Sequence, residues 1–304
     1  MLQQTQVTTV IPYYKRFLSR FPTYVDLARS NIQEVFAEWQ GLGYYRRAKH
    51  LHQAAQLMYK NGFPDNYSEW IKMPGVGTYT AGAIASLAYN ERVPAVDGNV
   101  VRVLSRINCL NSAVPTLISE CGTISKMWMG RVPPREWNQA LMELGATICK
   151  TIMPNCTICP VHDHCKAFQQ NKQAEYPKKR VKTTLKPLIH IVECPMKGKQ
   201  IGLIESGHDK WWNGLWTFRR HEFEGNQDIH YIIGTLDIGN SKPFAKYKHI
   251  VTNHKITAIA FLTKQLPKAA SWISLDDVDK IALPSPDRFF VNEIKKLTTE
   301  RSKT

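Results

Sequence analysis

The chain has 304 residues, 43% of them hydrophobic, which is enough for two domains with separate cores. No apolar run approaches the roughly 20 residues that span a bilayer, and the start does not resemble a signal peptide, so we expect no membrane insertion. Forty Lys and Arg residues against 25 Asp and Glu residues give a formal net charge of +15. That surplus favours a polyanionic partner, and nucleic acid before a membrane surface, because no terminal stretch predicts a basic amphipathic helix.

Apolar residues recur at intervals of three and four through most of residues 1–165, which predicts an all-α domain. The pattern begins at 7–21 and returns at 35–39, 51–58, 80–88, 100–107 and 137–148. Ser30 with Gln33 matches a capping box ahead of the second of these helices. The periodic stripe starts almost at the first residue with no preceding cap, which leads us to expect further sequence upstream.

Seven cysteines occur, and four of them crowd into a stretch of 17 residues with the spacing C-x6-C-x2-C-x5-C, at Cys149, Cys156, Cys159 and Cys165. An odd number of cysteines without a signal peptide argues against a secreted disulfide framework. Four thiolates in one loop can hold an iron–sulfur cluster or a tetrahedral zinc ion, and the spacing leaves both open. Either way we expect a structural site, because four protein ligands leave no position for a substrate.

The composition changes after Cys165. Residues 172–186 carry six Lys and Arg against one acid, so we expect an extended basic linker, solvated or lying along a DNA backbone. Beyond it, short apolar runs at 188–192, 201–204 and 256–261 predict strands, and a helical pattern returns near 289–297. The second part of the chain is therefore expected to be a mixed α/β domain.

Between two helical stretches, residues 73–82 read M-P-G-V-G-T-Y-T-A-G. A turn with two glycines that leads directly into a helix offers bare amides and a helix N-terminus to a phosphate, although an ordinary helix–helix turn has the same pattern. Twenty residues after Gly77, Asp97 precedes the next helix, where most aspartates serve as N-caps. One helix and its return can nevertheless bring this carboxylate beside the turn.

These motifs together carry a family resemblance. The hairpin at 74–77, the aspartate at 97 and the four-cysteine loop occur in this order and spacing in endonuclease III-like DNA glycosylases. The resemblance implies an all-α helix-hairpin-helix glycosylase domain with a [4Fe-4S] loop at 1–165. It also implies a basic linker at 166–187 and a smaller α/β Nudix-like domain at 188–304.

Tyr79 distinguishes between the bifunctional and the monofunctional members of this family. Bifunctional members place a lysine at this position to form a Schiff base with the sugar, and a tyrosine cannot supply the amine. The chain therefore resembles the monofunctional adenine DNA glycosylases of the MutY type, which the stretches at 1–7 and 41–45 also match. Residues 215–218 resemble the Nudix-like domain of that family, but no Nudix catalytic box is present, so no pyrophosphohydrolase activity is expected.

The resemblance implies hydrolysis of the N-glycosidic bond of an adenine that lies opposite 8-oxoguanine or guanine and is flipped from the duplex. Asp97 would stabilise or trap the positive charge that develops on the deoxyribose, and Tyr79 and Asn99 would help shape the sugar pocket. Gly75 and Gly77 would hold a backbone phosphate.

Other positions match residues that contact the bases. Gln139 matches a position that contacts the adenine edge, and Gln3, Gln4 and Tyr44 match residues that wedge into the stack and fill the vacated space. In the second domain, Thr252 and Asn253 lie where the family carries a Phe-Ser-His loop that recognises 8-oxoguanine. Because only the hydroxyl is kept there, we expect weaker or differently tuned recognition, and a plain strand edge is the other interpretation.

The start of the chain departs from the family. The glutamate that protonates the departing adenine lies two residues before the position that is Met1 here. On that basis we expect a truncated or misassigned start, or a damaged copy, with severely reduced glycosylase activity and with mismatch binding partly retained.

Three alternatives stay open: a non-catalytic mismatch-binding protein, a glycosylase for another base such as thymine in T:G mispairs, and a basic iron–sulfur DNA-binding module. The two-domain architecture weighs against the thymine alternative, and the pairing of Asp97 with Tyr79 against the last. The expected partner is double-stranded DNA with 8-oxoguanine:A or G:A mispairs. We expect a monomer, located in the cytoplasm with the nucleoid.

Overall fold

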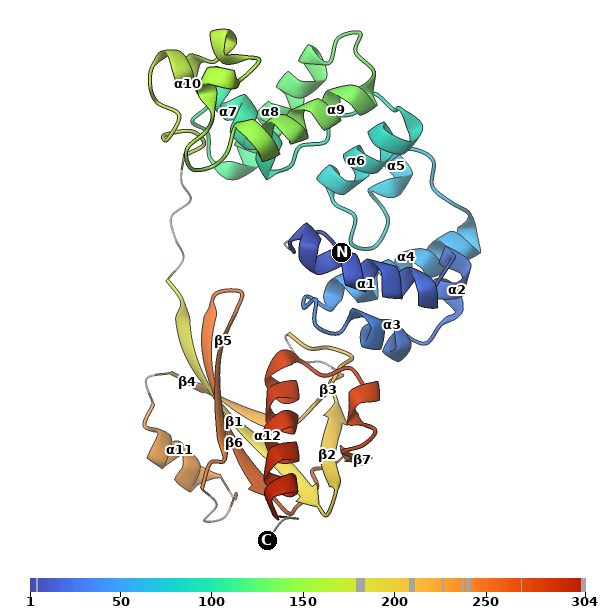
Figure 1. Ribbon diagram of the computed structural model, residues 1–304, viewed down its shortest axis with the longest axis vertical. Coiled ribbons are helices and arrows are strands. Elements are labelled where there is room, and N and C mark those ends of the chain that lie inside the picture. The colour runs from blue at the N-terminus through green and yellow to red at the C-terminus, as the bar shows by residue number, and fades with distance from the viewer. Residues whose placement is uncertain are drawn as a thin grey trace. The chain divides into compact units, whose positions relative to one another are not determined.

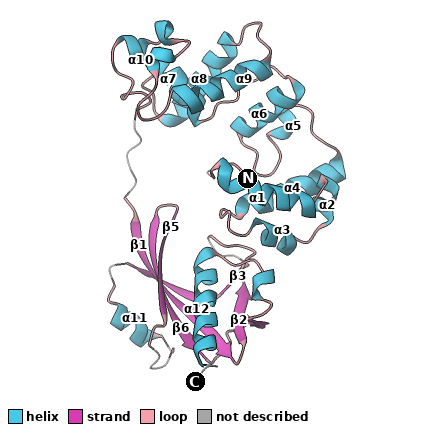
Figure 2. Ribbon diagram, in the orientation of Figure 1, coloured by secondary structure: helices cyan, strands magenta, loops and turns pink. Residues whose placement is uncertain are grey.

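The structure is a computed structural model that describes residues 1–3, 5–178, 184–207, 211–225, 227–236, 238, 242–268 and 270–301. The chain forms two compact units, one made of Met1–Gln56 with Lys182–Thr304 and the other of Leu57–Val181 (Figure 1). In the described chain, regular structure before residue 184 is exclusively helical, and strands occur only after it (Figure 2). The predicted fold class, an all-α part followed by a smaller α/β part, is confirmed. The domain boundaries drawn from composition stay a prediction, and residues 179–183 of the basic linker lie outside the described residues.

The helical part contains, in order, α1 (Val7–Arg20), α2 (Tyr24–Arg29), α3 (Ile32–Trp39), α4 (Arg46–Asn61), α5 (Tyr67–Trp70), α6 (Thr78–Tyr89), α7 (Gly98–Asn108), α8 (Val114–Trp128), α9 (Pro134–Glu143), the π-helix η1 (Leu144–Ile148), the 3-10 helices η2 (Cys156–Ile158) and η3 (His162–His164), and α10 (Lys166–Gln169). The α/β part contains β1 (Lys186–Lys197), β2 (Gln200–Glu205), β3 (Trp216–Thr217), β4 (Arg219–Glu224), α11 (Ile229–Thr235), β5 (Ala245–Val251), β6 (His254–Thr263), β7 (Ala270–Ser274), η4 (Val278–Lys280) and α12 (Ser285–Arg301).

The capping box predicted for α3 is wrong by one residue. The N-cap is Asn31, whose side chain accepts a hydrogen bond from the backbone of Gln33, and Glu34 accepts one from the backbone N–H of Asn31. Ser30 is instead the C-cap of α2, where its hydroxyl donates to the carbonyl of Leu27. Of two consecutive residues that can cap a helix, Ser30 caps the end of α2 and Asn31 caps the start of α3.

A mixed sheet organises the α/β part. Its strand order is β3-β2-β1-β6-β5, with β4 paired to β1 and β7 to β2, and the central strands β1 and β6 run parallel. Ile189 and Ile191 of β1 pack with Ile232 of α11, whereas Val192 and Cys194 pack in the cluster that includes α12. Burial on both faces explains why apolar residues occupy adjacent positions of β1, as at Ile191 and Val192, rather than alternate positions only.

The core of the second unit centres on α7. Its buried residues Val100, Val103 and Leu104 pack with residues of α8, α9 and α10. Helix α7 therefore joins the elements that carry the predicted active site to the cysteine loop. No helix of the described residues is long and apolar enough to cross a membrane.

Candidate functional site

The glycine turn forms as the sequence predicts, between α5 and α6. Gly75 has a φ of 74°, which only glycine adopts without strain. Gly77 is the N-cap residue of α6, and no side chain caps that helix. The amides of the first turn of α6 are thus free of a side-chain cap, as an anion-binding helix N-terminus requires.

The loop before Asp97 is held by the buried side-chain amide of Asn138, a residue that no sequence motif singles out. Asn138 of α9 is fully buried, accepts a hydrogen bond from Ala95 N at 2.9 Å and donates one to Val93 O at 3.0 Å. Gly82 of α6 lies directly against the carbonyl of Pro94, so closely that any side chain there would collide with it. Helices α6 and α9 together hold the loop that presents Asp97.

Asp97 is the N-cap of α7, as predicted. Its Oδ1 accepts a hydrogen bond from Val100 N at 2.8 Å, and its Oδ2 accepts one from Asn99 Nδ2 at 2.9 Å. The carboxylate is half-buried, so solvent or a ligand reaches it on one side. Both oxygens are held, which gives a negative charge with a fixed position.

Tyr79 lies close enough to Asp97 to respond to its charge. Burial first, and then the negative charge of Asp97, raises the pKa of the Tyr79 phenol above its ordinary value. The hydroxyl donates to Met142 Sδ at 3.7 Å. Gln139 precedes Met142 by one turn of α9 and is exposed, so it lies on the same side of that helix. Tyr79, Asp97 and Asn99 are therefore brought together, with Gln139 on the neighbouring face.

Arg102 connects this group to the cysteine loop. Its Nη2 donates to Asn99 Oδ1 at 2.8 Å and to Gly145 O at 2.7 Å, and its Nε donates to Cys149 O at 2.7 Å. A planar guanidinium suits such a fork of acceptors. The sequence offered no signal for this role, because its partners lie more than 40 residues away in η1 and the loop.

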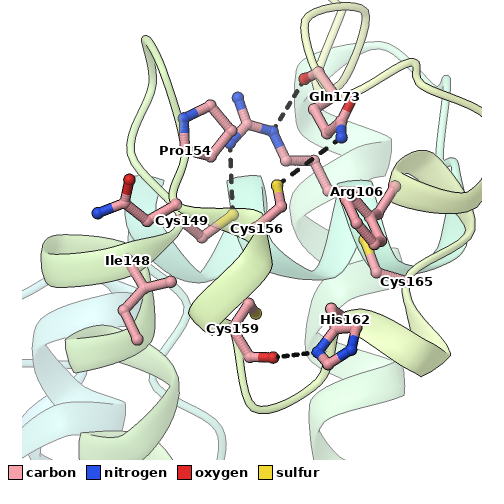
Figure 3. A pocket seen from close by; sticks show the side chains of 11 residues that line it. Arg106, Ile148, Cys149, Pro154, Cys156, Cys159, His162, Cys165 and Gln173 are labelled. Atoms are coloured by element: carbon pink, nitrogen blue, oxygen red, sulfur yellow. Dashed lines mark hydrogen bonds between the residues drawn. The ribbon is translucent and has the colours of Figure 1, made fainter.

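The four predicted cysteine ligands line one cavity, together with Arg106, as Figure 3 shows. Arg106 Nη1 donates to Cys149 Sγ at 3.3 Å, and Gln173 Nε2 donates to Cys156 Sγ at 3.7 Å. His162, also in the cavity wall, hydrogen-bonds through Nδ1 with Cys159 O at 2.7 Å. N–H donors directed at sulfur are what a thiolate-bound cluster needs around it.

The four thiols are a complete set of metal ligands. Four cysteines are the ligand set of an iron–sulfur cluster and also of a structural zinc site. Burial raises the pKa of the Cys159 and Cys165 thiols. Metal binding to these thiols would therefore release protons.

The predicted wedge residues belong to the other unit. Tyr44 is 62% exposed, with a φ of 50°, and the guanidinium of Arg47 lies 5.2 Å from the centre of its ring. Arg47 also donates to the carbonyls of Met1 and Gln3, so one side chain holds the start of the chain beside the tyrosine. Gln3 is exposed, and Gln4 lies outside the described residues.

Thr252 and Asn253 form the two-residue turn of the β5–β6 hairpin. Thr252 is exposed and has a φ of 52°, an unusual conformation for a β-branched residue, and its hydroxyl donates to Val251 O at 2.7 Å. Asn253 O accepts a hydrogen bond from Lys186 N at 2.8 Å, which fixes the turn to the start of β1. Thr252 and Asn253 therefore lie at the tip of a hairpin between two paired strands.

Comparison with known proteins gives a consistent result. Residues 1–120 match the family described as HhH-GPD superfamily base excision DNA repair protein. An adenine DNA glycosylase of Buchnera aphidicola subsp. Acyrthosiphon pisum (strain APS) is 32% identical over 314 residues, which cover 97% of this chain and 88% of that protein. The adenine DNA glycosylase of Arabidopsis thaliana is 38% identical over 258 residues, covering 72% of this chain and 40% of that protein. The human adenine DNA glycosylase is 41% identical over 181 residues, which cover 58% of this chain and 33% of that protein.

The chain thus spans at most about two fifths of the length of these two eukaryotic relatives and most of the bacterial one. A thermostable thymine-DNA glycosylase of known structure is similar with a TM-score of 0.51 and 24% identity, over 56% of this chain and 80% of that protein. That likeness shows the fold alone.

Proposed function

Because this chain belongs to the adenine DNA glycosylase family, within the HhH-GPD superfamily of base excision DNA repair proteins, we propose that it removes adenine mispaired with 8-oxoguanine or guanine. The bond broken is the N-glycosidic bond, whose electron pair leaves with the adenine. The oxygen of a water molecule bonds to the sugar carbon, and the net reaction transfers one proton from that water to the adenine. The observation that carries the proposal is the fixed carboxylate of Asp97 beside Tyr79.

Asp97 supplies the electrostatic part of the reaction. Breaking the glycosidic bond builds positive charge on the deoxyribose, and a preorganised carboxylate stabilises that charge in the transition state. Asn99 holds one carboxylate oxygen, and Val100 N holds the other, so little reorganisation is needed. Tyr79 offers a phenol with a raised pKa and no amine, which supports hydrolysis without a Schiff base and hence without strand cleavage.

The two predicted DNA contacts of this unit support the same function. The uncapped N-terminus of α6, with Gly75 and Gly77 in the turn, is suited to a backbone phosphate. Gln139 is exposed on the face of α9 that Tyr79 reaches through Met142, where an amide can hydrogen-bond the edge of a flipped base. In the other unit, Tyr44 presents an exposed ring that can stack on a base.

The hairpin tip at Thr252 and Asn253 is our candidate for recognition of 8-oxoguanine. Its turn carries a hydroxyl and an amide and is anchored to β1, and the strained backbone at Thr252 is typical of a functional position. The partner we propose is duplex DNA that contains 8-oxoguanine:A or G:A.

Cys149, Cys156, Cys159 and Cys165 would hold a [4Fe-4S] cluster, with Arg106 and Gln173 as hydrogen-bond donors to sulfur. Four cysteine ligands would close this site to substrate, and its chemistry would be structural: it would crosslink the loop. Arg102 connects that loop to Asn99 and so to the carboxylate of Asp97.

The test is single-turnover base release from an 8-oxoguanine:A duplex, measured beside binding to duplexes with an uncleavable adenine analogue opposite 8-oxoguanine or thymine. We expect adenine release, at least about tenfold tighter binding opposite 8-oxoguanine, and no product trapped by borohydride. Release of thymine from T:G, or a trapped covalent product, would overturn the proposal. Discrimination without any release would favour the mismatch-binding alternative, which the glycosylase relatives do not favour.

A further inference from the structure

A basic pocket lies in the unit that contains the α/β part. A cavity of about 370 Å³ opens between the first turns of α4 and the loop that precedes β3. Arg46, Lys49 and His50 line it from α4, and Trp211 and Asn213 line it from the loop. We call it the α4 pocket.

The described residues that line the α4 pocket include two cationic side chains, Arg46 and Lys49, and no carboxylate. In the described part of the chain, neither Arg46 nor Lys49 takes part in an ion pair. Lys49 Nζ donates to Asn213 Oδ1 at 3.2 Å, and Arg46 Nε contacts His50 Nε2 at 3.5 Å. Burial, and then the charges of Arg46 and Lys49, lowers the pKa of His50, which is a sign of the positive potential there. Two unneutralised cations around one cavity are suited to an anion.

Both walls of the pocket are held in place. Gln33 Nε2 donates to Gly214 O and to Glu205 Oε1, both at 2.9 Å, which anchors the loop on α3. Gly214 has a φ of 84° and lies against the ring of Phe36, so the loop can approach the helices only with glycine there. Tyr45 OH donates to Leu283 O at 3.3 Å, which ties the start of α4 to the α/β part.

The aromatic wall is equally fixed. The ring of Trp211 stacks on that of His190 with centroids 5.8 Å apart and an interplanar angle of 28°. It also packs on the edge of Trp212 at 5.7 Å and contacts His254 at 5.5 Å. His254 directly follows Asn253, so the wall of the pocket contacts the hairpin that carries the proposed 8-oxoguanine tip. A ligand strand that reaches the hairpin passes close to the pocket.

We propose that the α4 pocket binds a phosphodiester group of the DNA, with Arg46 and Lys49 as its charged partners and Trp211 as an aromatic wall for the attached nucleoside. This rests on the proposed function only in taking the same duplex as ligand. The contact is to the backbone, so it positions the duplex without reading its sequence. A free nucleotide carries the same phosphate group, and the experiments below distinguish it from the DNA backbone as the ligand.

The first experiment measures the salt dependence of duplex binding for the variant R46Q/K49Q. Loss of a phosphate contact lowers the slope of log K against log salt by about 0.9 and weakens binding about tenfold at low salt. The affinity for damaged and for undamaged duplexes should fall by the same factor, so the ratio of the two affinities should not change. The control is K199Q/K296Q, which removes two exposed charges elsewhere in the α/β part and should leave the slope unchanged.

Asn213→Asp is the second variant, in case R46Q/K49Q folds poorly. It keeps an oxygen for Lys49 and adds a negative charge to the pocket, so binding should weaken similarly. An unchanged slope in both folded variants would overturn the proposal. A lost discrimination ratio with an unchanged slope would instead count against the proposed function.

The source of the phosphate is settled by replacing single backbone phosphates with uncharged methylphosphonates along both strands. Wild-type protein should lose affinity at one or two phosphates, and R46Q/K49Q should lose nothing further at those same positions. Titration with deoxyadenosine monophosphate and with inorganic phosphate provides the other arm. Saturable binding of either that R46Q/K49Q abolishes, without a sensitive backbone phosphate, would overturn the proposal in favour of a free-nucleotide site.

Discussion

Replacing Gly145 with alanine tests how tightly η1 must pack on α7. Gly145 is buried, and a Cβ atom there would lie 2.6 Å from Asn99 Cβ and 3.1 Å from Asn99 O. Real Cβ contacts are not that short, so η1 and α7 must move apart. Overpacking of this kind costs typically about 1–3 kcal/mol, and the gain from replacing a helical glycine offsets about 1 kcal/mol of it.

We therefore expect Gly145→Ala to lower the free energy of unfolding by up to about 2 kcal/mol, measured by urea denaturation with circular dichroism. The matched control is Gly122→Ala in α8, whose Cβ would meet only Val96 Cγ2 at 3.9 Å. That change should stabilise by up to about 1 kcal/mol. Adenine release should fall in Gly145→Ala because Asn99 is displaced from Asp97, and stay unchanged in Gly122→Ala. Stabilisation of both variants would refute the close packing.

Three other predictions follow from local geometry. Gly75→Ala forces alanine to a φ of 74° and should cost about 1–2 kcal/mol in urea denaturation, whereas Gly75→Asn should cost less. Arg102→Lys keeps the charge but loses the fork to Asn99 and Gly145, so adenine release should slow by about tenfold or more while Arg131→Gln, an exposed control, leaves it unchanged. Burial foremost lowers the pKa of His190 to about 3, so between pH 6.5 and 5 the unfolded chain binds a proton that the folded one does not. The free energy of unfolding, measured as a function of pH, should therefore fall by about 2 kcal/mol between pH 6.5 and 5. His190→Phe should reduce that fall. The same pH profile in the variant and the wild type would contradict this role of His190.

The helices and the local caps were the most predictable part of the fold. The N-cap role of Asp97 and the glycine turn depend on residues within a few positions of each other, and both are confirmed. The capping box of α3 was misplaced because Ser30 and Asn31 are both good caps, and only the end of α2 decides between them. The residues around Ser30 and Asn31 do not themselves show which of the two caps α3.

Strand β4 was not predicted. Its sequence, R-R-H-E-F-E, has no apolar run, and it becomes a strand because it pairs with β1. Edge strands of this type are specified by a partner rather than by their own pattern. Strands β1 and β6 were predicted because both of their faces are buried, which places apolar residues at adjacent positions of the sequence.

The roles of some residues in the candidate site could not be predicted from the sequence either. Asp97, Tyr79 and the four cysteines carry motifs, but Arg102 and Asn138 act through partners more than 40 residues away. The α4 pocket combines the start of α4 with a loop some 160 residues later, as the hydrogen bond from Lys49 to Asn213 shows. Such pairs are set by tertiary packing and leave no trace in residue spacing.

The central claim is that the Asp97 carboxylate stabilises positive charge on the sugar. A duplex that carries a pyrrolidine abasic nucleotide opposite 8-oxoguanine presents that charge without any bond to break. At about 4 Å and an effective dielectric constant near 20, two unit charges interact by about 4 kcal/mol, less for a half-exposed group. We expect Asp97→Asn to weaken binding of this duplex by about 100-fold and to leave binding of the uncharged tetrahydrofuran analogue nearly unchanged. Equal effects on both analogues would contradict the claim.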